Sequence, residues 1–281
     1  MSQTKVDSLN MYRDFESFLD TIEHTDPNPD FVAKKRHLSS RQTGDYDWDF
    51  DAGYEGTLKL AREGWPEGLK KIKKALPSVR NATKAQTRRK GFELRPDGLF
   101  PNVSAYASGS PFCMHKRAPG TRSLTRTTRI TYQACFHCGV SASDQVNFGA
   151  ALLSLVTSLE RKGDSVDLVA AYDTTDGKGS GTVHRVRIKR SGRRVDLDRL
   201  AFAMIHPGMF RRLVFAAFER DGWFPKKNQT GHYGYPGFVE TPEDGIRINN
   251  AAQLGRARTF ESALEYVMSK YNGTQSESEK I

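Results

Sequence analysis

Two clusters of cysteine and histidine have the spacing most suggestive of chemistry in this sequence. Cys135 and Cys138 are separated by two residues, a spacing that lets two thiolates face one metal ion. Cys113 and His115 lie upstream, and the four residues together could form a Cys₃His zinc site, the one cofactor that the sequence suggests. Two other interpretations stay open: the thiols could fill a core or lie on the surface without metal, or they could serve redox chemistry.

A strongly basic segment is the second candidate. Between Gly68 and Ile130 there are 15 Lys and Arg against only two acids, so this segment carries +13 while the whole chain carries +10. Such asymmetry is typical of a surface that contacts phosphate, in nucleic acid or anionic lipid, although a solvated loop or a surface for an acidic protein would share it. The predicted nucleic-acid contacts are Lys70, Lys71, Lys73, Lys74, Arg88, Arg89, Lys90, Lys116 and Arg117.

Aromatic residues are interleaved with these charges. Phe92, Phe100, Tyr106 and Phe112 could stack on unpaired bases, or they could anchor the segment to its own domain. Phosphate contacts position a protein without reading bases, so weak sequence specificity is expected.

Strong catalytic motifs are absent from the sequence. It has no Gly-x-x-x-x-Gly-Lys-Ser/Thr loop, no Gly-x-Ser-x-Gly elbow and no His-Glu-x-x-His pair. His206, with Arg211 and Arg212 one turn later, could form an anion pocket or cap a buried helix junction. The sequence therefore favours a non-enzymatic protein, and an enzyme stays open as the third alternative. We expect three alternating acids in a polar loop to be solvated rather than to bind magnesium: Asp47, Asp49 and Asp51.

Composition predicts a soluble, cytoplasmic globule with polar extensions. The 281 residues are 37% hydrophobic, enough for a packed core. No window approaches the ~18 apolar residues of a membrane span, and the N-terminus lacks the apolar stretch of a signal peptide, so no membrane partner is expected. An odd count of three cysteines argues against a disulfide framework.

The first part of the chain predicts helices and then an irregular segment. Apolar residues at helical spacing predict a docking helix over residues 8–22. A short helix from Tyr54 is stopped by Gly64, and Pro66 suits the first turn of a second helix ending near Leu76. No periodicity persists from Pro77 to Thr128, which predicts an extended, mobile arm.

The second part predicts an α/β core with a three-layer architecture and a mostly parallel sheet. A strand from Ile130 leads to a helix with a Ser141 to Asp144 capping signal and a stop at Gly163, and a strand over 165–172 follows, implying a parallel pair. The elements expected after these are a strand over 182–190, helices capped by Asp196 and opened by Pro207, a strand over 246–248 and a helix over 260–271. The expected organisation is an N-terminal helical extension (1–67), a basic irregular segment (68–128), an α/β core domain (129–273) and a disordered tail (274–281).

The stretch NFGAALLSLVTSLERKGDSVDLVAAYD resembles the first half of a von Willebrand factor A-like domain, in which a strand feeds a long helix that returns to a neighbouring strand. In that family the first strand ends in a metal-binding Asp-x-Ser-x-Ser motif. The corresponding residues here read CFHCGVSAS, so the acid is missing and Ser141 and Ser143 keep the spacing only. The resemblance therefore does not imply metal-dependent adhesion.

Three landmarks resemble a family of uncharacterised bacteriophage proteins: GWPEG from Gly64, Gly-Ser-Pro-x-x-Met from Gly109, and LDRLAFAMIHPGMFRR from Leu197. This resemblance implies a viral origin, in host cytoplasm or associated with the virion. The function that we expect is a non-enzymatic viral protein that contacts nucleic acid through the basic segment in genome handling or assembly. The alternative is a protein-interaction adaptor on a von Willebrand factor A-like scaffold with an acidic protein partner.

Overall fold

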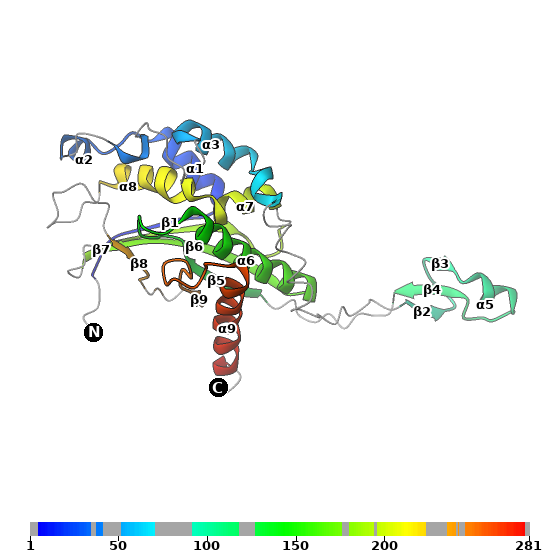
Figure 1. Ribbon diagram of the computed structural model, residues 1–281. Helices are drawn as coiled ribbons and strands as arrows, with labels where there is room; N and C mark the ends of the chain where they lie inside the picture. Colours follow the sequence, from blue (N-terminus) through cyan, green and yellow to red (C-terminus); the bar gives the residue numbers. More distant parts are fainter. Residues whose placement is uncertain are drawn as a thin grey trace.

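In the computed structural model, the described residues form two β-sheets and the helices that accompany them (Figure 1). The larger sheet has six strands and the smaller has three. The residues that the structure describes are 5–34, 38–41, 52–70, 92–117, 127–175, 180–193, 196–222, 235–239, 241 and 245–278.

The larger sheet is mostly parallel, as the sequence predicts. Its order is β1-β7-β6-β5-β9, and β8 pairs with β6. Neighbours β1 and β7, β5 and β6, and β5 and β9 are parallel, whereas β7 and β8 run antiparallel to β6. The strands are β1 (Lys5–Tyr12), β5 (Thr127–Gln133), β6 (Ser165–Thr175), β7 (Ser180–Lys189), β8 (Tyr235–Gly237) and β9 (Ile246–Ile248).

Helix α6 (Ala142–Lys162) joins the parallel strands β5 and β6 and agrees with the capping signals in the sequence. The Ser141 hydroxyl accepts a hydrogen bond from the backbone N–H of Asp144 at 3.1 Å. Gly163 ends the helix at φ 99°, in the left-handed region that favours glycine. Leucines along one side of α6, among them Leu152 and Leu159, are buried in the core.

The later helices also follow their sequence signals. The Asp196 carboxylate caps α7 (Leu197–Ile205) by accepting from the backbone N–H groups of Asp198 and Arg199. The chain then forms the π-helical turn η3 (Met209–Val214), α8 (Phe215–Asp221) and α9 (Phe260–Ser278). Because α9 continues to Ser278, the expectation of a disordered tail from residue 274 is wrong for its first residues.

The N-terminal segment differs from the expected single helix. Residues 5–12 form the edge strand β1 beside β7, and α1 (Phe15–His24) begins only after a capping box between Asp14 and Ser17. The apolar stripe itself is present, since Phe15, Phe18, Leu19 and Ile22 are buried. Further helices are α2 (Pro29–Lys34), η1 (Ser39–Arg41) and α3 (Gly53–Glu63), with residues 66–70 also helical.

Helices α1, α3, α6, α7 and α8 lie on one side of the larger sheet in Figure 1. Side chains on that face pack against them: Tyr172 stacks on Phe210, and His184 meets the edge of Phe218. The opposite face carries Asp173 and Arg185, and both side chains are bonded to the backbone of Val239. Helix α9 contacts α6 and β9. In the described parts of the chain, no second layer of helices covers the face of the sheet that carries Asp173 and Arg185 (Figure 1). The prediction of three layers is therefore corrected to one sheet with one helical layer.

Part of the segment expected to be irregular is ordered. Strands β2 (Phe92–Arg95), β4 (Met114–Arg117) and β3 (Phe100–Pro101) form an antiparallel sheet in the order β2-β4-β3, with α5 (Val103–Ala107) between β3 and β4. The strands are short and lack a regular apolar alternation, which explains why the sequence pattern missed them. No helix in the described chain is both long and apolar enough to cross a membrane.

Candidate nucleic-acid interface

The small sheet and α5 turn apolar side chains toward solvent. Tyr106 is 71% exposed, Phe112 is 52% exposed and Phe100 is 46% exposed. Among the side chains described between residues 94 and 116, none belongs to the buried hydrophobic core. Exposed aromatic and aliphatic side chains that gather where the described side chains form no buried core are typical of a contact surface. We call residues 92–117 the aromatic unit.

Local hydrogen bonds fix the shape of the aromatic unit. The Asn102 side chain caps α5 through the backbone N–H of Ala105 at 3.0 Å, and the Asn102 backbone N–H donates to Cys113 O at 2.6 Å. A Cβ at Gly98 would lie 2.6 Å from the backbone oxygen of His115, so only glycine fits this close approach. The ring of Phe100 lies 4.9 Å from that of His115, which holds Phe100 in place while leaving it half-exposed.

The structure places three of the nine predicted nucleic-acid contacts. Lys70 is exposed, and Arg117 belongs to β4. Lys116 is exposed and its ammonium lies 2.5 Å from the Asp97 carboxylate, a pair that lowers the pKa of Asp97. Because both side chains are solvated, this pair is worth little and would yield readily to a phosphate. Six predicted contacts lie outside the described residues: Lys71, Lys73, Lys74, Arg88, Arg89 and Lys90.

The four predicted zinc ligands are not brought together. Cys113 and His115 lie on the aromatic unit, whereas Cys135 is buried after β5 and Cys138 is exposed. The Cys135 sulfur lies 3.1 Å from the backbone oxygen of Asp173 and 3.2 Å from that of Gly237, and burial raises the pKa of Cys135 to about 12. The Cys135 sulfur is thus bonded within the core and forms no metal-type group with Cys113 or His115 in the described chain, so the zinc site stays a prediction that this geometry does not support.

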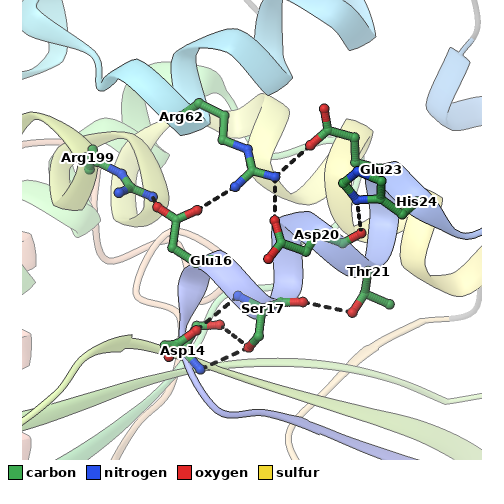
Figure 2. Close-up of polar contacts among 9 residues, drawn as sticks. All are labelled: Asp14, Glu16, Ser17, Asp20, Thr21, Glu23, His24, Arg62 and Arg199. Atoms are coloured by element: carbon green, nitrogen blue, oxygen red, sulfur yellow. Dashed lines mark hydrogen bonds and ion pairs between the residues drawn. The ribbon is translucent and has the colours of Figure 1, made fainter.

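One group of metal-type ligands does occur in the described chain, on α1. Asp20, Glu23 and His24 place ligand atoms within 4.8 Å of one another. Figure 2 shows that Arg62 of α3 already occupies this position, with its guanidinium 2.7 Å from Asp20 and 2.6 Å from Glu23. It also lies 2.5 Å from Glu16. These acids therefore fasten α1 to α3, and the group carries no metal proposal.

The pocket considered around His206 is a packed helix junction. The buried His206 accepts a hydrogen bond at Nδ1 from the backbone N–H of Gly208 at 3.1 Å and stacks on Phe202. Arg212 is buried and donates to the backbone oxygen of Ser40, while Arg211 donates to that of Cys138. The two arginines thus bond separate segments of the chain, which favours the capping interpretation of His206.

A basic cleft escaped the sequence analysis. It has a volume of about 270 Å³ and lies where β1 and β7 end and α1 and α7 begin. Arg190, Arg193 and Arg199 line it. The run Lys189-Arg-Ser-Gly-Arg-Arg194 just before the Asp196 cap was the available signal, but the opposite wall comes from residues 14–16, far away in the sequence.

Comparison with known proteins gives a family and no function. No curated protein and no solved structure shows a significant match to the chain. A family model matches residues 2–272, nearly the whole length, and therefore spans the α/β body, the basic segment and the aromatic unit together. The chain belongs to the family described as Domain of unknown function (DUF7192).

Proposed function

We propose that this protein binds single-stranded nucleic acid through residues 68–128 and is not an enzyme. The observation that carries the proposal is the aromatic unit, whose exposed rings lie within the most basic part of the chain. Nucleic-acid binding without sequence preference combines these two features, since cations track the phosphates and aromatic rings stack on successive bases. The role that we propose for this binding is in genome handling or assembly.

Exposure of the rings supports stacking over the alternative use as internal anchors. An anchor buries its ring against its own domain, whereas Tyr106 and Phe112 are more than half exposed. Each base stacked on such a ring contributes about 1–3 kcal/mol. Phosphate neutralisation would come from the flanking cations, because the interval from Gly68 to Ile130 carries +13. Weak discrimination between sequences is expected, since neither contact reads base edges.

A protein partner is the second candidate. The aromatic unit also exposes the aliphatic residues Leu99 and Val103, which do not stack on bases and would suit an apolar protein surface. On this alternative the protein is an adaptor whose basic segment contacts an acidic partner. We also propose, from the sequence resemblances, a bacteriophage origin in host cytoplasm or virion, and a kinship of the unit β5–α6–β6 with von Willebrand factor A-like domains.

The test is a binding titration with the full chain. Fluorescence anisotropy with labelled single-stranded DNA, single-stranded RNA and duplex DNA is measured across a salt series. The stacking variant is Tyr106→Ala/Phe112→Ala, and its control is Tyr235→Ala/Leu254→Ala, which removes two side chains of similar exposure from elsewhere. We expect the stacking variant to lose affinity for single strands about tenfold or more, with the control within about twofold of the parent.

A charge variant tests the phosphate contacts separately. Replacing Lys70, Lys71, Lys73, Lys74, Arg88, Arg89 and Lys90 with Gln should flatten the salt slope by at most about five on single strands, at ~0.7 per lost contact. Absence of binding at low salt to all three nucleic acids rejects the nucleic-acid proposal and leaves the adaptor. Binding that survives in both variants with an unchanged slope places the interface elsewhere on the chain.

A further inference from the structure

The basic cleft lies at the carboxyl ends of two neighbouring parallel strands. β1 ends at Tyr12 and leads into α1, and β7 ends at Lys189 and leads into α7, so both helices begin at the same edge of the sheet. In open α/β sheets, ligands bind in the crevice outside the carboxyl ends of the strands. Helix N-termini at such a crevice add partial positive charge.

The acids of the cleft are already engaged by the protein. Asp14 accepts from the backbone N–H of Ser17 at 2.9 Å and caps α1, and Asp196 caps α7. The two oxygens of Glu16 each accept from a guanidinium at 2.5 Å, one from Arg62 and one from Arg199 (Figure 2). The capping carboxylates also occupy N–H groups of the first turns, so a ligand would be held chiefly by side chains.

Two arginines of the cleft remain available. Arg190 and Arg193 are exposed, and neither pairs with a carboxylate of the described residues. Lys189, in contrast, is buried and bonded to Glu160 at 2.5 Å. Arg199 is likewise engaged, because its guanidinium lies 2.5 Å from Glu16. The cleft therefore offers two exposed positive charges that have no carboxylate partner in the described chain.

From this geometry we propose that the cleft binds a phosphate monoester. Two guanidinium groups match the charge of a phosphate dianion, and their planar forks match its oxygens in bidentate geometry. A volume of about 270 Å³ exceeds what a bare phosphate fills, and Phe15, Ile188 and Leu200 provide apolar wall for an organic part. The phosphate could belong to a free small molecule or to the 5′ end of a nucleic-acid strand. The site lies outside residues 68–128 and does not depend on the proposed function.

Calorimetric titration of the full chain tests the site. The probes are adenosine monophosphate, inorganic phosphate and adenosine, in a buffer without other phosphate or sulfate. The variant Arg190→Gln/Arg193→Gln removes the two unpaired charges. The control Lys59→Gln/Arg258→Gln removes two cations at exposed positions outside the cleft. We expect adenosine monophosphate to bind the parent and the control equally and the cleft variant at least about tenfold more weakly, because the variant lacks two charge-assisted donors to the phosphate. Adenosine, which has no phosphate, should not bind.

Competition between two oligonucleotides separates the sources of the phosphate. The two oligonucleotides have the same sequence and differ only in a 5′-phosphate or a 5′-hydroxyl. If the phosphorylated strand displaces the hydroxyl strand from the parent but not from the cleft variant, the cleft binds strand ends. Binding of adenosine monophosphate without this preference assigns it to a small molecule. The proposal is overturned if the parent binds neither phosphorylated probe, or if the cleft variant, with parental circular dichroism and urea midpoint, binds them as tightly as the parent.

Discussion

The guanidinium of Arg185 donates to the carboxylate of Asp173 in the interior of the protein, where the two side chains are only 2% and 0% exposed. Both partners also bond the backbone of Val239: the Val239 N–H donates to Asp173 at 2.7 Å, and Arg185 donates to the Val239 oxygen at 2.6 Å. The guanidinium further lies over the Phe238 ring. This ion pair therefore fastens Phe238 and Val239, which directly follow β8, to strands β6 and β7.

Breaking this pair should destabilise the fold strongly. Arg185→Met leaves the Asp173 carboxylate buried without its cation, and we expect the free energy of unfolding in urea to fall by about 3–5 kcal/mol. The double variant Asp173→Leu/Arg185→Met removes both charges and should recover a large part of that loss, because no uncompensated charge remains. A double variant as unstable as the single one would show that the hydrogen bonds to Val239, rather than the unpaired charge, dominate.

Arg62 joins α3 to α1 through three carboxylates, as Figure 2 shows. Arg62→Met keeps the aliphatic stem but leaves Glu16, Asp20 and Glu23 as like charges three and four residues apart on one helix. Exposed ion pairs contribute about 0–1 kcal/mol each, so we expect a loss of about 1–2 kcal/mol in low-salt urea unfolding.

Salt and a neighbouring lysine provide the controls for Arg62. The loss should shrink near 1 M salt, where the Debye length is about 3 Å. Lys59→Met on the same helix removes an exposed cation that has no ion pair in the described chain, and its effect should stay within about 0.5 kcal/mol. Equal losses in the two variants would contradict a specific role for Arg62.

Local signals predicted the second part of the chain better than the first. Ser141 and Gly163 delimit α6, and Asp196 caps α7, because caps act within a few residues of themselves. The strand β1 has no comparable signal, since it is held by pairing with β7, which lies far along the chain. The helical spacing from Met11 onward therefore extended the expected helix past its true start at Phe15.

For the candidate sites, too, the sequence predicted local features but not contacts between distant residues. The Cys135 and Cys138 spacing was visible, but β5 carries Cys135 into the core while Cys113 belongs to the aromatic unit, and spacing cannot report that separation. The cleft joins residues 14–16 to residues 188–200, so its two walls meet only through the β1–β7 pairing. The exposure of Tyr106 and Phe112 is likewise a tertiary property, whereas the surrounding charge could be read directly from composition.

Two helical glycines should respond oppositely to alanine. A Cβ at Gly149 in α6 would lie 2.6 Å from the backbone oxygen of Met204, so Gly149→Ala should force α6 and α7 apart and cost about 1–3 kcal/mol. At Gly273 in α9 no atom lies within 4 Å of the added carbon, and Gly273→Ala should stabilise by about 0.5–1 kcal/mol through helix propensity. Urea unfolding measures both, and a loss of stability in Gly273→Ala would contradict helical backbone at this position.

The free energy of unfolding should fall at alkaline pH because the Cys135 thiol is buried. Its pKa is raised from 9.0 to about 12 by burial, so between these values the unfolded chain loses a proton that the folded chain keeps. The stability due to the neutral thiol is complete below pH 9 and is lost as the pH rises toward 12, by about 1.4 kcal/mol per pH unit for one group. Buried Tyr132 and Tyr172, whose pKa values burial also raises, add to the decline.

Cys135→Ala isolates the contribution of this thiol. The variant should be less stable at every pH because of the cavity, but its free energy of unfolding should fall less steeply than that of the parent between pH 9 and 11. In the folded parent at pH 8, a thiol reagent should modify the exposed Cys138 and the half-buried Cys113, and Cys135 only after unfolding. Elemental analysis of the parent and of Cys135→Ala tests the zinc prediction. More than about 0.2 equivalents of zinc in the parent, absent from the variant, would mean that Cys135 binds the metal as a thiolate. That result would contradict the assignment of Cys135 as a neutral core residue.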